Sequence, residues 1–346
     1  MENLVFSINA TFPVFILMLL GMLFRRLGFI SDRFAKDMNS FVFKVALPVN
    51  VFSQLYTVDF GAFWDGRFIA FCFAGTAASI AVAALLSLLI RDRSDRGEFI
   101  QAAYRSSASL LGMAYIENMY PNAAMGSLMI IGAVPLYNAA AVVILSLTGS
   151  KSLENNVSAP AASSMNPAVA PADAAASVDH ADAARAERAK LLKTTLVGIV
   201  TNPIILGIVF GVAWSALRIP APKLLATTVS YIGRLSTPLG LLAMGASFSF
   251  TSAKQKLLPS LAATALKLCG FVALLVPAAI ALGFRDQKLV AILIMAGSAT
   301  TVSSFVMAKS MGHEGTLTAT TVMLTSLFAA FSLTFFIWLL RTMGFI

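Results

Sequence analysis

Long apolar stretches dominate the pattern of hydrophobic and polar positions along this chain. A helix needs about 20 mostly apolar residues to cross the hydrocarbon layer of a bilayer. The stretches that qualify are 4–24, 36–56, 67–90, 99–120, 124–148, 191–217, 225–250, 256–283, 288–311 and 315–341. The pattern therefore predicts an all-α transmembrane protein of about ten helices.

Composition supports a membrane protein and excludes an ordinary soluble one. Of the 346 residues, 58% are hydrophobic and 12% are charged, whereas soluble domains carry roughly a quarter charged residues. The net charge of +9 is explained by Lys and Arg in cytoplasmic loops, so nucleic acid is not an expected partner. Cys72 and Cys269 lie in apolar stretches and are interpreted as packing residues, not as metal ligands.

One segment of different composition divides the chain. It is rich in Ala, Pro, Ser and Asp, includes SAPAASSMNPAVAPADAAAS, and cannot bury a core. We predict a disordered cytoplasmic linker over 149–190. It separates one five-helix block at 1–148 from a second at 191–346.

The two blocks show signs of an internal repeat. Shifting the sequence by 190 residues pairs Pro13 with Pro203, Gly21 with Gly211, Lys44 with Arg234, and Pro48 with Pro238. The alternative is chance matching of apolar sequence. Because five spans are an odd number, two such copies would lie upside down relative to each other, the inverted repeat of many secondary transporters.

Orientation follows from the distribution of Lys and Arg. With the N-terminus outside, fifteen of these residues lie in the inner loops and six in the outer ones. Cytoplasmic loops carry the excess of positive charge. Both termini are therefore predicted on the non-cytoplasmic side.

Hydroxyl residues interrupt the fourth span of each block, at 105–114 and 297–304. Non-helical backbone at this depth survives only where protein or water satisfies its polar groups, so these segments are candidate parts of a pathway. Broken helices there would direct helix N-termini toward an anion. The alternative is that small residues only let helices pack closely.

Intramembrane charge also favours an anion. Lys44, Arg105, Arg234 and Lys267 lie within predicted spans, and each such cation needs a partner or a function. For Lys44 and Arg234 we favour bonds to carbonyls freed by the following prolines, with substrate binding as the alternative. For Arg105 we expect snorkelling to a headgroup if its span starts late. Glu117 is the one carboxylate near a break. No catalytic motif is present, so an enzyme is not expected.

An ordered set of motifs resembles the auxin efflux carrier family. The matching segments are Ala46–Pro48, Val134–Asn138, Thr201–Pro203, Met244–Ser247 and Val302–Lys309. The resemblance implies the ten-helix inverted repeat of bile-acid symporters and sodium–proton antiporters, in which helices four and nine are broken and cross at the substrate. It also implies a scaffold of spans one, two, six and seven beside an elevator-like transport domain. Family substrates are small organic anions, such as auxin or malonate-like acids. The chain departs from the family in having Ser107 in place of Asn, and Ala114 and Ala299 in place of Pro.

We therefore expect an elevator-type secondary carrier in the cell (inner) membrane that exports a small organic anion, such as a mono- or dicarboxylate or an auxin-like acid. The expected substrate site consists of Asn50, Gln54, Ser107, Ser109, Gly112, Ala114, Tyr137, Asn138, Thr300, Thr301, Ser303 and Ser304. Expected partners are the anion and the bilayer, without a cofactor or metal. A coupled proton or sodium ion and a homodimer remain open. The alternatives are a sodium- or proton-coupled symporter of the same fold, and a membrane sensor or receptor that binds without transport.

Overall fold

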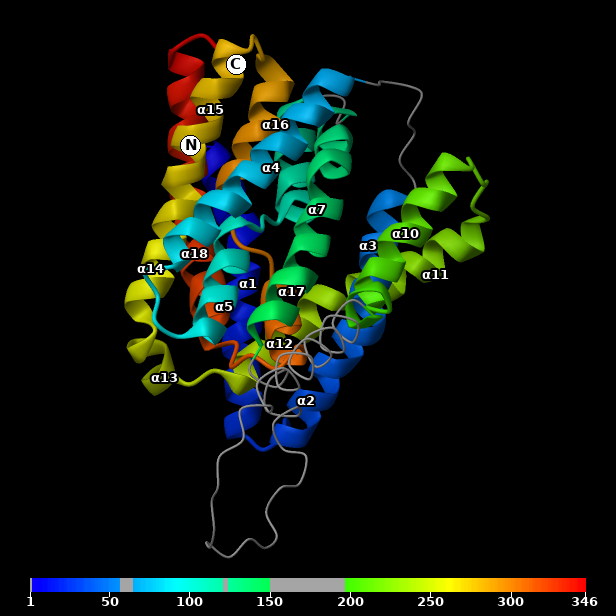
Figure 1. Ribbon diagram of the computed structural model, residues 1–346, viewed down its shortest axis with the longest axis vertical. Coiled ribbons are helices and arrows are strands. Elements are labelled where there is room, and N and C mark those ends of the chain that lie inside the picture. The colour runs from blue at the N-terminus through cyan, green and yellow to red at the C-terminus, as the bar shows by residue number, and fades with distance from the viewer. Residues whose placement is uncertain (1, 57–64, 121–123, 150–196) are drawn as a thin grey trace, which may run out of the picture.

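The computed structural model (Figure 1) describes residues 2–56, 65–120, 124–149 and 197–346. Residues 150–190 of the predicted linker, and the start of the sixth predicted span at 191–196, lie outside the described residues. In the described ranges the regular elements are helices. Among them, Gly66–Ser87, Met125–Thr148, Leu257–Ala281 and Thr316–Thr342 are long and apolar enough to cross a membrane, and Pro203–Ala216 is a shorter apolar helix.

The helices follow the predicted stretches closely. The N-terminal half contains α1 (Glu2–Arg26), α2 (Asp32–Phe41), η1 (Val42–Ala46), α3 (Leu47–Leu55), α4 (Gly66–Ser87), α5 (Arg93–Tyr104), η2 (Ala108–Gly112), α6 (Met113–Met119) and α7 (Ala124–Thr148). The C-terminal half contains α10 (Pro203–Ala216), α11 (Lys223–Arg234), α12 (Ser236–Ser247), α13 (Phe250–Gln255), α14 (Leu257–Ala265), η3 (Leu266–Gly270), α15 (Phe271–Ala281), α16 (Asp286–Gly297), α17 (Ser303–Ser310) and α18 (Thr316–Thr342).

Local sequence explains where several helices begin. Asn202 caps α10 by accepting a hydrogen bond from the backbone N–H of Ile204 at 3.0 Å, and Pro203 occupies the first turn, where no intrahelical N–H bond is needed. Ser31 caps α2 in the same way, accepting from the N–H of Phe34 at 3.1 Å. These helix starts are therefore encoded within a few residues of chain.

Pro48 changes the hydrogen bonding of the continuous helical segment formed by α2, η1 and α3. Pro48 has no N–H to donate, so the helix loses one regular bond. The helical segment continues through the π-helical turn η1, and the N–H of Leu47 donates to the carbonyl of Val42. The predicted bonds from Lys44 and Arg234 to carbonyls freed by proline are not seen. Both side chains are exposed, and within the described residues neither has such a hydrogen bond.

Two helix pairs link the halves through glycine. In the pair of α1 with α12, a Cβ at Gly21 or Gly245 would overlap backbone carbonyl groups of the other helix. In the pair of α10 with α3, Gly207 lies against the backbone of Pro48. Figure 1 shows α10 and α11 beside α3 at one edge of the molecule, away from α14 and α15. Small residues allow this close approach in lipid.

The core lies around α16. All residues from Leu289 to Gly297 are buried, because α16 packs against α7, α15 and α18. Such a helix is apolar on every side and surrounded by protein, not by lipid or water. Its C-terminal end at Gly297 therefore lies deep inside the molecule, and the functional site begins there.

Candidate functional site

The two predicted breaks are present, and they meet. Helix α5 ends where Arg105 adopts an extended conformation (φ −74°, ψ 126°), and α16 ends where Ser298 does the same (φ −75°, ψ 162°). The N–H of Ser107 donates to the carbonyl of Ala299 at 2.9 Å, and Ser106 forms an isolated antiparallel bridge with Thr300. The first break therefore lies at 105–107, at the start of the predicted segment 105–114.

Side chains and backbone of neighbouring helices satisfy the polar groups of the second break. The N–H of Thr300 donates to Thr325 Oγ1 at 3.0 Å, and Thr300 Oγ1 donates to the carbonyl of Ala102 at 2.7 Å. Gln101 Nε2 donates to the carbonyl of Ser304 at 2.8 Å. Non-helical backbone persists at this depth because protein groups replace the missing helical bonds.

Lys267 supplies a positive charge where two broken helices end. It lies on η3, is fully buried, and its ammonium donates to the carbonyls of Tyr104 at 3.2 Å and Met295 at 3.5 Å. It also donates to Ser106 Oγ. Tyr104 and Met295 lie in the last turns of α5 and α16, where carbonyls carry the negative end of the helix dipole. Lys267 therefore stabilises both C-terminal ends.

Arg105 provides the second buried cation, and its predicted snorkelling to a headgroup is wrong. The side chain is 2% exposed. Its guanidinium donates to Asn138 Oδ1 at 2.8 Å, to Ser303 Oγ at 2.9 Å and to Met307 Sδ at 2.8 Å. All three partners are neutral, and the ion pairs found among the described residues do not include Arg105. Its charge is therefore held by dipoles alone.

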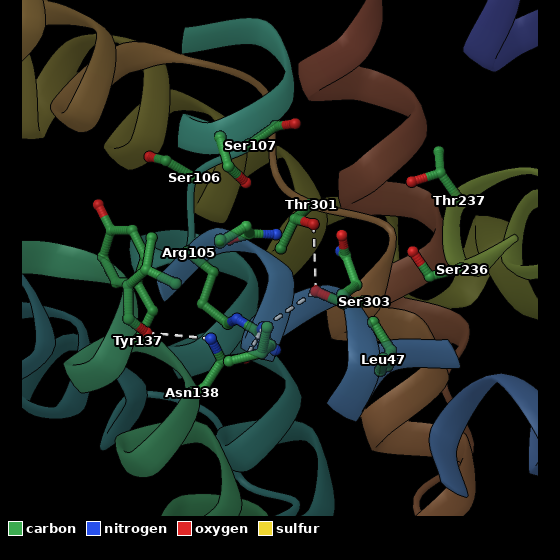
Figure 2. Close-up of a pocket in the computed structure, with 15 residues that line it drawn as sticks. Leu47, Arg105, Ser106, Ser107, Tyr137, Asn138, Ser236, Thr237, Thr301 and Ser303 are labelled. Atoms are coloured by element: carbon green, nitrogen blue, oxygen red, sulfur yellow. Dashed lines mark hydrogen bonds between the residues drawn. The ribbon is translucent and has the colours of Figure 1, made fainter. Parts of the chain in front are cut away.

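A polar cavity of about 40 Å³ lies beside Arg105. Figure 2 shows Arg105 between Asn138 and Ser303, with Thr301 next to Ser303. Eight predicted residues line the cavity, namely Asn50, Gln54, Ser107, Ser109, Tyr137, Asn138, Thr301 and Ser303. The remaining lining residues were not predicted: Leu47, Val51, Arg105, Ser106, Val134, Ser236 and Thr237.

A larger, mainly apolar cavity of about 300 Å³ adjoins the first. Its walls include Val14 and Leu17 of α1 and Leu241 of α12. Ser107, Thr237 and Thr301 line both cavities. These three hydroxyl residues therefore lie where the polar cavity meets the apolar one.

The other four predicted residues lie outside the polar cavity. Ala114 and Thr300 line the apolar cavity. Gly112 ends η2, where a Cβ would contact the side chain of Ile294, and Ser304 is fully buried. The missed pair Ser236 and Thr237 could have been found from the sequence, because two hydroxyl residues stand directly before Pro238 inside the predicted span 225–250.

Buried carboxylates lie away from this site. Glu117 is exposed, whereas Glu98, which was not singled out, is 1% exposed. Glu98 accepts hydrogen bonds from the N–H of Gly315 at 2.7 Å and from the N–H and hydroxyl of Thr318, both at 3.0 Å. It thus caps the N-terminus of α18. The described residues contain no group of three or more His, Cys, Asp or Glu that could hold a metal ion.

The family of the chain is shown by comparison with known proteins. A family profile described as "Membrane transport protein" matches residues 6–337. The chain belongs to this family, the auxin efflux carrier family. It is therefore a multi-pass membrane transport protein, as the motifs predicted. A search of curated proteins finds no match.

Proposed function

We propose that this membrane transport protein is a secondary carrier that exports a small organic anion bound beside Arg105. The observation that carries the proposal is the buried guanidinium, which faces a polar cavity and has only neutral partners among the described residues. A buried charge without a counterion is costly in protein and in lipid. An anionic substrate would supply the missing charge on binding.

The helix ends around the cavity support the same sign of charge. Helix α17 begins at Ser303, next to Arg105, and a helix N-terminus attracts anions. The opposite helix ends, at Tyr104 and Met295, are already bonded by Lys267. The N-terminus of α17 therefore adds positive potential at the cavity, and the bonds from Lys267 offset the negative potential of the two C-terminal helix ends.

The adjoining cavities favour a monocarboxylate with an apolar body over a compact dicarboxylate. The carboxylate would bind Arg105 and the hydroxyls of Ser107, Thr301 and Ser303. Its apolar part would extend past Thr237 into the cavity lined by α1 and α12. Burying apolar surface there contributes roughly 25 cal/mol per Å², which a small diacid cannot gain.

The transport cycle would follow from two inverted repeats at 1–148 and 191–346, joined by a cytoplasmic linker. The packing of α1 on α12 and of α10 on α3 supports a scaffold built from both halves, against which the broken helices move as an elevator. With both termini outside the inner membrane, an inside-negative potential would favour export by about 2.3 kcal/mol per charge per 100 mV.

Binding and flux test the proposal separately. The purified chain is screened for thermal stabilisation by acetate, malonate, benzoate and indole-3-acetate, and each is then followed in proteoliposomes. We expect benzoate or indole-3-acetate to raise the unfolding midpoint most and to be transported. Ser107→Leu should abolish both effects, while Thr228→Leu, on the exposed face of α11, should change neither. Stabilisation that survives Ser107→Leu would place the site elsewhere.

The same preparation separates the alternative functions. Replacing sodium by choline, or collapsing a proton gradient, leaves the rate of an uncoupled carrier unchanged and stops a coupled symporter. A sensor or receptor would bind a carboxylate in detergent yet give no flux after reconstitution.

A further inference from the structure

A second polar cavity lies at the opposite end of α17 from Arg105. Its volume is about 530 Å³, and it is formed by α2 and η1 on one side and by the end of α17 on the other. Helix α17 has eight residues, so about 10 Å along its axis separate Ser303, in the central cavity, from Ser310, in this one. We call it the basic groove.

The described residues that line the basic groove carry positive charge and no negative charge. Among the described residues that line it are Lys36, Lys44 and Lys309, and none of those lining residues is acidic. Lys309 donates to the carbonyl of Glu314 at 3.0 Å, which fixes its position but does not neutralise it. Lys44 lies on η1, inside a stretch long enough to span the membrane, where a cation requires a partner.

The other residues that line the groove supply serine hydroxyl groups and hydrogen bonds that hold its two sides together. Ser40, Ser247 and Ser310 line the groove. Asn39 joins its two sides, because its Nδ2 donates to Ser310 Oγ at 2.8 Å. His313 is not available to a ligand. Its ring nitrogens are 3.0 Å from Ser94 Oγ and 3.0 Å from the carbonyl of Leu145.

From this arrangement we infer that the basic groove binds a phosphate group. A phosphate carries about −1.5 to −2 charges at neutral pH and presents several acceptor oxygens, matching several ammonium groups and serine hydroxyls better than one carboxylate does. The phosphate belongs either to a free phosphate compound or to a lipid headgroup. Because the lysines come from both sides, a bound phosphate ties α2 and η1 to α17 and stabilises this arrangement of the two.

Inorganic phosphate tests the site in neutral detergent. Sodium phosphate is titrated into the full chain at constant ionic strength, set with sodium chloride, and the unfolding midpoint is recorded. The wild-type midpoint should rise. The double variant Lys44→Gln with Lys309→Gln should bind phosphate about tenfold more weakly, which corresponds to about 1.4 kcal/mol. The matched Lys44→Arg with Lys309→Arg variant keeps the charge and should keep the response. Lys223→Gln, on α11, should also respond as the wild type does.

Lipid nanodiscs separate the two sources of phosphate. If a headgroup occupies the groove, adding phosphatidylglycerol to phosphatidylcholine discs should raise the midpoint of the wild type but not of the double glutamine variant. If a free phosphate is the ligand, inorganic phosphate should act equally in both kinds of disc. Arg105→Met should preserve the phosphate response, which distinguishes this groove from the central cavity. Equal responses of the wild type and the double glutamine variant to phosphate and to phosphatidylglycerol would overturn the inference.

Discussion

Replacing Arg105 by methionine should remove anion binding while leaving the ligand-free protein folded. Methionine fills much of the same volume without a charge. For a carboxylate about 4 Å from the guanidinium, an effective dielectric constant of about 20 gives an attraction of about 4 kcal/mol. Losing it should raise Kd by between two and three orders of magnitude.

The cost to the ligand-free protein should be much smaller. The variant loses hydrogen bonds to Asn138 Oδ1, Ser303 Oγ and Met307 Sδ, worth about 1 kcal/mol each. It also avoids the burial of an unneutralised cation, which costs several kcal/mol. We therefore expect an unfolding midpoint no lower than that of the wild type.

Calorimetric titration with the best carboxylate of the screen, together with thermal unfolding, measures both quantities. Arg105→Lys is the matched control. It keeps the charge but cannot make the forked contacts of a guanidinium, so it should fall between the wild type and Arg105→Met. An unchanged Kd in Arg105→Met, or a large loss of stability, would show that Arg105 is a packing residue and refute the reasoning.

Three further predictions concern stability and are checked by chemical or thermal unfolding. Gly245→Ala should destabilise the protein by roughly 1–3 kcal/mol, because the new methyl group overlaps a carbonyl of α1; unchanged stability would mean that α1 and α12 separate freely. Glu98→Gln should cost about 2–3 kcal/mol, since its amide group cannot accept all the bonds that the carboxylate accepts from the N-terminus of α18 and Thr318; a loss no larger than that of a surface variant would contradict this. The ammonium of Lys288, by hydrogen bonding, lowers the pKa of Asp65 below its usual 3.8. The ionised carboxylate therefore stabilises the folded protein above pH 3.8, and this stabilisation is lost as the pH falls through the lowered pKa of the folded state. Asp65→Asn should therefore cost about 0.5–1 kcal/mol at neutral pH and nothing in strong acid, and equal losses at both pH values would argue against the ion pair.

The sequence by itself determined the helices, their approximate ends and the presence of the two breaks. These features depend on local chemistry: about 20 apolar residues per span, proline without an N–H, and capping residues such as Asn202. Eight of the fifteen residues that line the polar cavity were also predicted, and four of them, Ser107, Ser109, Thr301 and Ser303, lie on the two hydroxyl-rich segments that interrupt the apolar pattern.

Only the tertiary structure decided which charged residues are functional candidates. Hydropathy treats contact with lipid and burial in protein alike, so it could not separate the exposed Lys44 and Arg234 from the buried Lys267 and Arg105. Helix α5 begins at Arg93, before the apolar stretch at 99, and this carries Arg105 far from its start. The contact of Ser107 with Ala299 joins positions distant in the chain, and no local pattern of residues specifies such a pairing.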